Sequence, residues 1–407
     1  MVKKVAIIGG GAAGFFTAIN IAMINPDIKI TIYEASNHLL AKVLVSGGGR
    51  CNVTNAIYDP KELIKNYPRG YDFLEPVFNQ FNSKDTQNWF NAYGVKLKTE
   101  DDGRIFPVSN SSQTIYNCLT HQCKILGISI RLKSRLKQIE FKNQQWELKF
   151  KNFDTHADFV VLATGSNLMM YDLLRSIKIP IVDPVPSLFT FNVKQHEFIV
   201  LAGISVPNSK VKIKEIPDHE EHGPLLITHW GFSGPAILRL SAWLAIPLAE
   251  IEYSFKLIIN WNNYDIELLK RQLLIQIKDQ PKQKISNWIG HGLPKRLWQN
   301  LFIQMGFKEY LNWAELGKKG IDSILKNLTC FEVSIEGKST FKEEFVTAGG
   351  IDLSSVNPFT FAIEHHHHLY AVGELLNIDA ITGGFNFQAA WSGSYVAAKA
   401  ISGIAHK

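Results

Sequence analysis

The chain has 407 residues, of which 46% are hydrophobic and 20% are charged, and its formal net charge is +6 at pH 7. That length predicts two or three domains, and the composition is typical of a soluble globular enzyme. The charge is mild for this size and the sequence has no long basic run, so the composition argues against nucleic acid as a partner.

Cysteine usage and hydropathy indicate a cytoplasmic protein. The four cysteines form no C-x-x-C pair and are too few for a disulfide framework, which fits a reducing compartment. Residues 5–24 are apolar, but glycines interrupt them and no convincing cleavage site follows. No uninterrupted apolar run reaches the roughly 18 residues of a membrane-spanning helix, so we expect neither a leader peptide nor a membrane span.

The N-terminal segment predicts a strand, a turn, a helix and a second strand. Residues 4–9 (KVAIIG) are a short apolar run of the kind that is buried on both faces of a parallel sheet. Residues 12–24 have helical length and end before Asn25-Pro26, and residues 28–34 (IKITIYE) alternate apolar with polar side chains. Together these runs predict a βαβ unit.

Between residues 67 and 166 the chain mixes helices with short strands. Residues 67–127 are mostly helical, and Asn110 to Ser112 offer an N-cap for a helix over 113–126. Three strand-like runs at 128–134, 136–142 and 145–151 predict a small β-meander, and residues 157–166 (ADFVVLATGS) return to a buried strand.

The pattern changes after two prolines at 184 and 186, because the chain becomes β-rich and then helical before buried strands return. We therefore expect an α/β fold in which a nucleotide-binding domain is discontinuous. Its two parts are residues 1–189 and 344–407. The insertion consists of a β-rich domain at 190–263, a helical domain at 264–327 and a return strand at 328–343.

Gly9, Gly11 and Gly14 form the pattern G-x-G-x-x-G between the predicted first strand and helix. The first glycine permits a tight turn, the second lets the backbone approach a pyrophosphate, and the third lets the helix pack on the strand. Glu34 ends the next strand, where a carboxylate accepts hydrogen bonds from ribose hydroxyls and disfavours a 2′-phosphate. The predicted dinucleotide is therefore FAD or NAD rather than NADP.

A second glycine run lies in the segment VSGGGRCNVTN at residues 45–55. Glycines without a Cβ allow backbone N–H groups at Gly47–Gly49 to approach a ligand. Arg50 adds a permanent charge and a fork of donors suited to phosphate or carbonyl oxygens. A surface hairpin would explain the glycines but not this concentration of donors beside a dinucleotide fingerprint, so we expect this segment to contact the ligand.

The segment KVLVSGGGRCNVTN resembles the signature of the BaiN-like flavoproteins, also called the aminoacetone oxidase family of bacterial FAD-binding enzymes. Further similar segments occur in the expected order: DGRIFPVS, ADFVVLATG, THWGFSGPAILRLS, LPKRL, VTAGGIDL and LYAVGELLNIDAITGGFNFQAAWSGSYVA. The resemblance covers essentially the whole chain. It implies an FAD-binding Rossmann domain of glutathione-reductase type, interrupted by a β-barrel-like domain and a small helical domain, with FAD held non-covalently.

The resemblance implies FAD contacts from several distant stretches. Glu374 is suited to accept a hydrogen bond from a ribityl hydroxyl, and Asp379 either orients the preceding loop or approaches the flavin. After LATG this chain continues with Ser166-Asn167, where the family often has another glycine. The predicted cofactor-binding residues are Gly9, Gly11, Ala12, Ala13, Gly14, Glu34, Ala35, Lys42, Ser46, Gly47, Gly48, Gly49, Arg50, Cys51, Asn52, Ala163, Thr164, Gly165, Gly373, Glu374, Asp379, Thr382, Gly383, Gly384, Phe385 and Asn386.

The implied activity is that of an FAD-dependent oxidoreductase exchanging a hydride equivalent at flavin N5 with a small organic substrate. That substrate would sit where the flavin meets the inserted domain. The chain has no second dinucleotide fingerprint and no C-x-x-C redox pair, so electrons enter from the substrate or from transiently bound NADH or NADPH. The family offers aminoketone oxidation and enone reduction. The alternatives are a flavin-containing protein associated with RNA modification and a flavin-binding protein without turnover.

No catalytic acid or base stands out in the sequence. His229, Arg104 and Tyr93 are candidates, and Ser233 is the expected N-cap of an apolar helix that begins near Pro235. The run His365–His368 is interpreted, together with residues 218–222 (DHEEH), as solvated surface. Adjacent residues on a strand or helix point in different directions, so we expect no metal site there.

Overall fold

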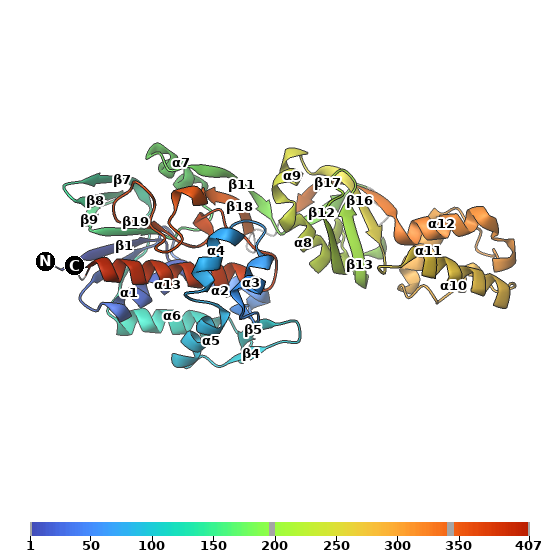
Figure 1. Ribbon diagram of the computed structural model, residues 1–407, viewed down its shortest axis with the longest axis horizontal. Coiled ribbons are helices and arrows are strands. Elements are labelled where there is room, and N and C mark those ends of the chain that lie inside the picture. The colour runs from blue at the N-terminus through green and yellow to red at the C-terminus, as the bar shows by residue number, and fades with distance from the viewer. Residues whose placement is uncertain (1, 195–199, 340–345, 406–407) are drawn as a thin grey trace. The chain divides into compact units, whose positions relative to one another are not determined.

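The computed structural model describes residues 2–194, 200–339 and 346–405 (Figure 1). The chain divides into two compact units: unit 1 comprises Met1–Pro186 and Lys342–Lys407, and unit 2 comprises Ser187–Phe341. Unit 2 is thus inserted into the sequence of unit 1. Within the described residues, unit 1 contains a Rossmann-type parallel sheet and unit 2 a closed barrel with helices, so the fold class is α/β as predicted.

The central sheet of unit 1 has the strand order β19-β10-β1-β2-β6, and its described strands are all parallel. Their bounds are Leu369–Ala371 (β19), Phe159–Leu162 (β10), Lys4–Ile8 (β1), Lys29–Tyr33 (β2) and Ser129–Arg131 (β6). In register, Ile7 of β1 faces Val161 on one side and Ile32 on the other. Because the chain leaves β1 towards β2 and returns on its other side at β10, the crevice beyond β1 is where such sheets bind ligands.

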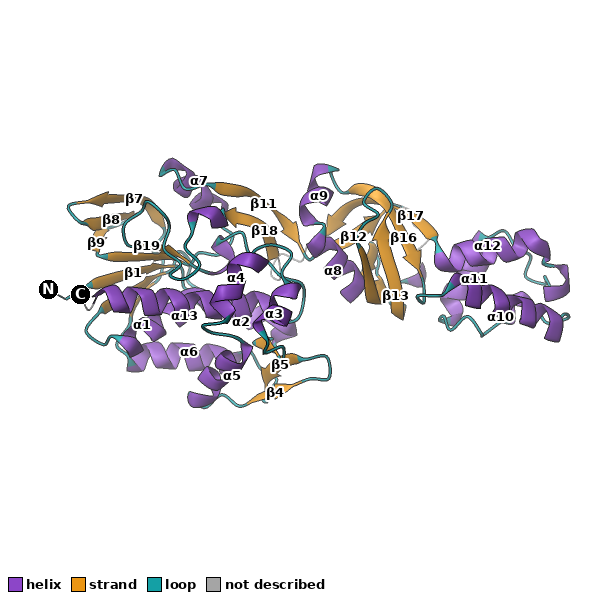
Figure 2. Ribbon diagram, viewed as in Figure 1, coloured by secondary structure: helices purple, strands orange, loops and turns teal. Residues whose placement is uncertain are grey.

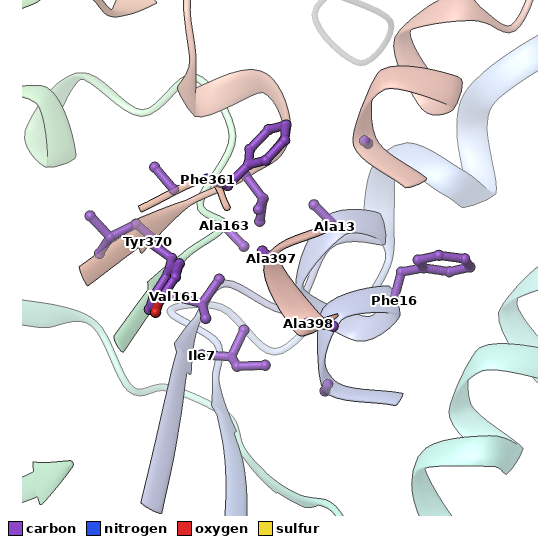
Figure 3. Packing of buried hydrophobic residues seen from close by; sticks show 14 of the residues in the cluster. Ile7, Ala13, Phe16, Val161, Ala163, Phe361, Tyr370, Ala397 and Ala398 are labelled. Carbon is purple, nitrogen blue, oxygen red and sulfur yellow. The ribbon is translucent and has the colours of Figure 1, made fainter. Parts of the chain in front are cut away.

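Two helices of unit 1 pack against each other beside this sheet: α1 (Ala12–Ile24) and α13 (Phe385–Ala405). Small residues permit the close approach. Ala13 and Ala397 lie in one buried cluster with Ile7 and Val161 (Figure 3). The buried hydroxyl of Ser394 donates a 3.0 Å hydrogen bond to the carbonyl of Ala13. The helix predicted over residues 12–24 is confirmed at both ends.

The predicted meander is wrong in its first strand. The meander consists of β7 (Leu136–Lys142), β8 (Gln145–Phe150) and β9 (Asp154–Ala157), whereas β6 joins the parallel sheet beside β2. Lys133 has a positive φ of 53° and breaks the chain between β6 and β7. The sequence pattern did not reveal this change of partner because β6 pairs with residues about 100 positions earlier.

The remaining elements of unit 1 surround the sheet. They are α2 (Ala41–Gly49), β3 (Thr54–Asn55), α3 (Pro60–Leu63), η1 (Ile64–Asn66), α4 (Tyr71–Phe78), α5 (Ser83–Ala92), β4 (Leu97–Thr99), β5 (Arg104–Pro107), α6 (Gln113–Ile125), α7 (Leu168–Ser176), β11 (Ile181–Ser187), β18 (Val346–Ile351), η5 (Leu353–Ser355) and η6 (Gly373–Leu375). Strands β3, β5 and β4 form a small antiparallel sheet, and β11 pairs with β18.

Unit 2 contains a closed barrel in the order β12-β15-β14-β13-β16-β17. The strands are β12 (Thr190–Val193), β13 (Ser205–Ile213), β14 (Glu220–Ile227), β15 (Gly231–Ser233), β16 (Ser254–Asn260) and β17 (Phe331–Ser339), and helices α8 (Pro235–Trp243) and α9 (Ala245–Glu250) accompany them. The helical part contains α10 (Ile266–Asp279), η3 (Ile285–Asn287), α11 (Lys295–Gln304), η4 (Trp313–Glu315) and α12 (Gly317–Thr329). Figure 2 shows these helices gathered at one end of the barrel.

Two predicted helix caps differ from the structure. Gly234, not Ser233, is the N-cap of α8, and its φ of 93° explains why the position is glycine. Ser112 is the N-cap of α6, but its hydroxyl donates to the carbonyl of Leu44 at 2.8 Å instead of capping the helix. Among the described residues, no helix combines the length and apolar character needed to cross a membrane.

Candidate dinucleotide site

The carboxyl ends of β1, β2 and β10 meet around Gly9. The N–H of Gly9 donates to the carbonyl of Tyr33 at 2.9 Å, which ties the end of β1 to the end of β2. A Cβ on Gly9 would lie 2.2 Å from the carbonyl oxygen of Ala163 at the end of β10, and Gly9 has a φ of 120°. Glycine is therefore required here because two strand ends and a turn share one small volume.

Gly14 and Gly11 have different surroundings. A Cβ on Gly14 would lie 2.1 Å from the carbonyl oxygen of Gly9, so Gly14 lets α1 pack on the turn. A Cβ on Gly11 would meet no protein atom within 4 Å. Gly11 is the N-cap of α1 and provides no side-chain cap, so the N–H groups of Ala12 and Ala13 in the first turn have no capping side chain. Such a helix end binds anions through backbone donors and the helix dipole.

Glu34 follows β2 at the same edge of the sheet. Its carboxylate accepts hydrogen bonds from the N–H groups of Gly10 at 2.8 Å and Ser36 at 2.7 Å. A carboxylate has about four lone-pair positions, so these bonds hold Glu34 in place and leave acceptor capacity for a ribose hydroxyl. Ala35, beside it, is exposed.

The second glycine run forms the end of α2. Helical geometry stops at Ser46, and Gly47, Gly48 and Gly49 have φ values of 58°, 66° and 81°. A Cβ on Gly48 would meet no protein atom within 4 Å, as at Gly11. The predicted glycine loop thus turns its backbone towards open space at its middle position, which is the geometry that a backbone contact to a ligand needs.

The thiol of Cys51 lies inside the protein. The residue is fully buried, and burial raises the pKa of its thiol to about 12. A thiol in that state is not a nucleophile. Cys51 has a positive φ of 59°, and its N–H donates to the carbonyl of Ser46 at 3.0 Å, so it closes the turn of the glycine loop.

Hydrogen bonds join this loop to the start of α13. The side chain of Asn55 donates to the carbonyl of Gly383 at 3.0 Å, and the side-chain oxygen of Asn52 accepts from the N–H of Gly384 at 2.9 Å. A Cβ on Gly384 would lie 2.6 Å from the carbonyl oxygen of Thr54. Two glycine segments more than 300 residues apart in the chain are therefore in direct contact.

Arg50 is held by acidic and aromatic neighbours. One of its donors bonds Glu100 at 2.6 Å, and its guanidinium carbon lies 4.0 Å above the centre of the Phe106 ring. Arg104 stacks on the same ring at 5.4 Å and bonds Asp102 at 2.7 Å. Arg50 is thus fixed in direction at the glycine loop, and its remaining donors are available to a ligand.

The ends of β10 and β19 complete the site. The hydroxyl of Thr164 donates to the carbonyl of Gly165 at 3.3 Å. A Cβ on Gly373 would lie 2.9 Å from the Cβ of Ala13 at the start of α1. The carboxylate of Glu374 pairs with Lys42 of α2, so two predicted ligand-binding side chains contact each other directly.

Asp379 is fully buried, and both of its oxygens accept from the guanidinium of Arg69. This supports the first of its two predicted roles, because the pair anchors the loop before α13. Sequence reasoning missed Arg69, which lies in a short Pro-Arg-Gly turn without any catalytic pattern. The amide of Asn386 likewise bonds both backbone groups of Ala380, at 3.0 and 3.1 Å, and Phe385 is buried, whereas Thr382 is exposed.

The candidate catalytic residues are scattered. The hydroxyl of Tyr93 lies 2.9 Å from the sulfur of Met23, near the C-terminal end of α1, whereas Gly11 caps the N-terminal end. His229 is exposed in the turn between β14 and β15 of unit 2, and no described residue forms a hydrogen bond with its ring. Tyr93 is thus separated from the glycine turn by the length of α1. Of the three candidates, His229 alone has an exposed side chain without a described hydrogen-bond partner.

The histidine run is not simply solvated. His365 and His367 are exposed, but both ring nitrogens of His366 lie 3.0 Å from backbone carbonyls, and His368 stacks on Phe159 at 4.4 Å. The run packs on the edge of the sheet, and the prediction of a solvated surface is therefore wrong for His366 and His368.

These features fit a dinucleotide. Gly11 begins α1 without a capping side chain and meets open space, and the carboxylate of Glu34 is fixed at the neighbouring Gly10. Gly48 of the second glycine run also meets open space. The donors suit a pyrophosphate and the carboxylate suits a ribose, as FAD requires.

Comparison with known proteins identifies the family of the chain. Residues 3–400 match the family model described as the HI0933-like protein Rossmann domain. The chain is 27% identical to the ribosomal RNA dihydrouridine synthase of Haemophilus influenzae, over 97% of this chain and 98% of that protein. It is 25% identical to the 3-dehydro-bile acid delta(4,6)-reductase of Clostridium scindens, over 98% of both chains. The fold resembles a 3-ketosteroid-delta4-(5alpha)-dehydrogenase from Rhodococcus jostii, with a TM-score of 0.51 and 14% identity, over 100% of this chain and 97% of that one.

Proposed function

The chain belongs to the HI0933-like Rossmann family of FAD-dependent oxidoreductases, and on that premise we propose that it is a reductase acting on a carbon–carbon double bond conjugated with a carbonyl group. The activities for which the two relatives are named share this chemistry. Dihydrouridine differs from uridine by two hydrogens beside a ring carbonyl, and a 3-dehydro-bile acid with a delta(4) double bond is an enone. This proposal selects reduction from the directions that the sequence leaves open.

The observation that carries the cofactor part of the proposal is the open space at Gly11 and Gly48. In the proposed complex, the first turn of α1 binds the pyrophosphate through backbone N–H groups, and Glu34 accepts hydrogen bonds from the adenosine ribose. Glu374, held by Lys42, binds the ribityl chain. The Arg69–Asp379 pair keeps the loop before α13 in position.

FAD bound non-covalently would supply the hydride equivalent from its N5 position. The carbon of the double bond that is farther from the carbonyl would accept it. A proton must then reach the carbon next to the carbonyl. We propose His229, the histidine candidate of the sequence, as its donor, because histidine is the side chain that most often acts as a general acid. NADH or NADPH, docking transiently, would return the electrons, since the sequence has one dinucleotide fingerprint.

The test begins with flavin reduction. The protein is loaded with FAD and mixed without oxygen with NADH, NADPH or an aminoketone, and the flavin absorbance is followed. The proposal expects rapid bleaching by a nicotinamide and recovery of the oxidised spectrum when an enone is added. The saturated ketone of the same skeleton is the matched control and should cause no recovery. Bleaching by the aminoketone alone, with peroxide formed on aeration, would instead identify an oxidase and end the proposal.

The proton donor is tested separately. His229→Gln should leave bleaching by the nicotinamide unchanged and slow recovery with the enone by about 10²-fold or more, as loss of a general acid does. Equal rates for the variant and the original protein would remove His229 from the mechanism while leaving the reductase proposal in place.

A further inference from the structure

Positive charge is concentrated in residues 264–327 of unit 2, a segment called here the helical block. It contains eleven Lys and Arg residues and six Asp and Glu residues, a net charge of +5. The whole chain has a net charge of +6, so the remaining residues together contribute only +1. The small net charge of the whole chain is therefore the sum of one strongly basic region and a nearly neutral remainder.

The cations of the helical block lack carboxylate partners within 4 Å among the described residues, although the guanidinium of Arg296 donates to the carbonyl of Val200. All eleven are exposed, and none forms an ion pair with another described residue. The neighbouring barrel is different, because several of its cations form ion pairs, such as Lys210 with Glu220 at 2.7 Å and Lys214 with Glu332 at 3.0 Å. Two acidic residues of the block cap helices instead: Asp265 caps α10 and Glu315 belongs to the capping box of η4.

The interior of the helical block contains a cluster of buried aromatic side chains. Trp288, Trp298 and Trp313 are buried, and the ring centre of Trp288 lies 5.7 Å from that of Trp298 and 5.4 Å from that of Trp313. His291 stacks on Trp298 at 4.6 Å, and burial lowers the pKa of His291 to about 4. The histidine is therefore neutral at pH 7, and the charge of the block comes from its exposed Lys and Arg alone.

We propose that the helical block is a docking surface for RNA. The cations come from several elements: α10 carries Lys270, Arg271 and Lys278, the following loop carries Lys282 and Lys284, and others begin α11 and α12. α10 also exposes Leu268, Leu274 and Ile275 beside its cations, as a helix at a membrane surface does. The cations of the loop, α11 and α12 lie outside that helix, and this spread fits contacts with successive phosphates.

An exposed aromatic residue lies among the cations. Tyr310 is 61% exposed, and the ammonium of Lys308 lies 5.7 Å from the centre of its ring. An aromatic ring beside lysines is the arrangement on which a base of single-stranded nucleic acid stacks. The inference rests on the proposed function, because the C5=C6 double bond of uracil is conjugated with the C4 carbonyl and uridine in RNA therefore belongs to the proposed substrate class.

The experiment compares two triple variants with equal loss of charge. K278Q/K282Q/K284Q neutralises three cations of the block, and K124Q/K137Q/K151Q neutralises three exposed cations of unit 1. Binding of a fluorescein-labelled RNA hairpin with a uridine-rich loop is measured by anisotropy between about 50 and 200 mM salt. The unfolding midpoint and FAD content of each variant report on folding.

The proposal expects the block variant to bind the RNA at least tenfold more weakly. Its slope of log K against log salt should be shallower by about 2, because each lost phosphate contact contributes about 0.7–0.9. The unit 1 variant should match the original protein. Equal weakening by both triples would overturn the proposal, as would binding to phosphatidylglycerol vesicles without binding to RNA. Enone reduction is measured on the same protein without RNA, so failure of the docking surface and failure of the reductase are told apart.

Discussion

In unit 1 the candidate cofactor site depends on contacts that leave no room: Gly9 and Gly14 each lie where a Cβ would meet a backbone oxygen about 2 Å away. In the helical block of unit 2 the functional groups are exposed and make no ion pair with described residues. The first arrangement ties function to stability, because the same contacts hold the fold and shape the site. The second separates them, because the unpaired cations contribute little to folding. Mutations should therefore cost most in unit 1 and least in the helical block.

The largest effect is expected from Arg69→Met. The substitution removes the guanidinium that pairs with the fully buried carboxylate of Asp379, and breaking a buried ion pair costs about 3–5 kcal/mol. Urea unfolding measures the change. Lys65→Met is the matched control, because its partner Glu62 is exposed and such a pair contributes at most about 1 kcal/mol. Adding Asp379→Asn to Arg69→Met should restore part of the loss, and no restoration would show that the buried charge is not the cause.

Gly14→Ala and Gly11→Ala separate folding from cofactor binding. The new Cβ at residue 14 meets the carbonyl oxygen of Gly9, so we expect a loss of about 2–3 kcal/mol in the free energy of unfolding without FAD. At residue 11 the Cβ meets no protein atom, so the FAD-free protein should keep its stability while its affinity for FAD falls about tenfold or more. Unfolding without FAD and titration with FAD measure the two quantities. Unchanged FAD affinity in Gly11→Ala would place the dinucleotide elsewhere.

His291 should make the stability of unit 2 depend on pH. Burial lowers its pKa to about 4, below the ordinary value of about 6.5, so the unfolded chain binds more protons between these values. Stability is therefore present at pH 7 and falls as the pH decreases, by about 2 kcal/mol between about pH 7.5 and about pH 5. His291→Gln keeps an acceptor for the N–H of Leu293 and should flatten this dependence. His229→Gln, at an exposed histidine, should not change it.

Sequence patterns predicted those parts of unit 1 whose structure is determined by residues close together in the chain. The helix over residues 12–24 and the fold class are confirmed, because a glycine turn, an apolar run and a terminating Asn-Pro lie within one segment. The contacts that fix the site are not local. Arg69 and Asp379 are 310 positions apart, and Lys42 and Glu374 are 332 apart. A single sequence gives no sign of such pairs: Lys42, Glu374 and Asp379 are predicted as separate cofactor contacts, and nothing near Arg69 in the chain points to Asp379.

The same limit applies to unit 2 in another form. The net charge of +6 is a sum over the chain and does not show where charge lies or whether it is paired. Lys210 of the barrel and Lys278 of the block are equivalent in such a count, yet among the residues that the structure describes only Lys210 has a carboxylate within 4 Å. The ion pairs of the barrel depend on its strand register, which places Lys212 of β13 opposite Glu220 of β14. Side chains of opposite charge on neighbouring strands are thereby brought together.

The smallest change in the free energy of unfolding is expected in the helical block, and a substitution in the barrel provides the direct comparison. K278Q/K282Q/K284Q removes charges that have no described partner, so the free energy of unfolding should change by no more than about 0.5 kcal/mol. Arg239→Gln in the barrel removes one charge, but its partner Glu221 is only 14% exposed, and loss of a hydrogen bond to a charged group costs about 1.5–3 kcal/mol. One substitution in the barrel should thus cost more than three in the block, as measured by urea unfolding. If the triple variant lost as much stability as Arg239→Gln, the cations of the block would be serving the fold, and their exposure would no longer argue for a partner.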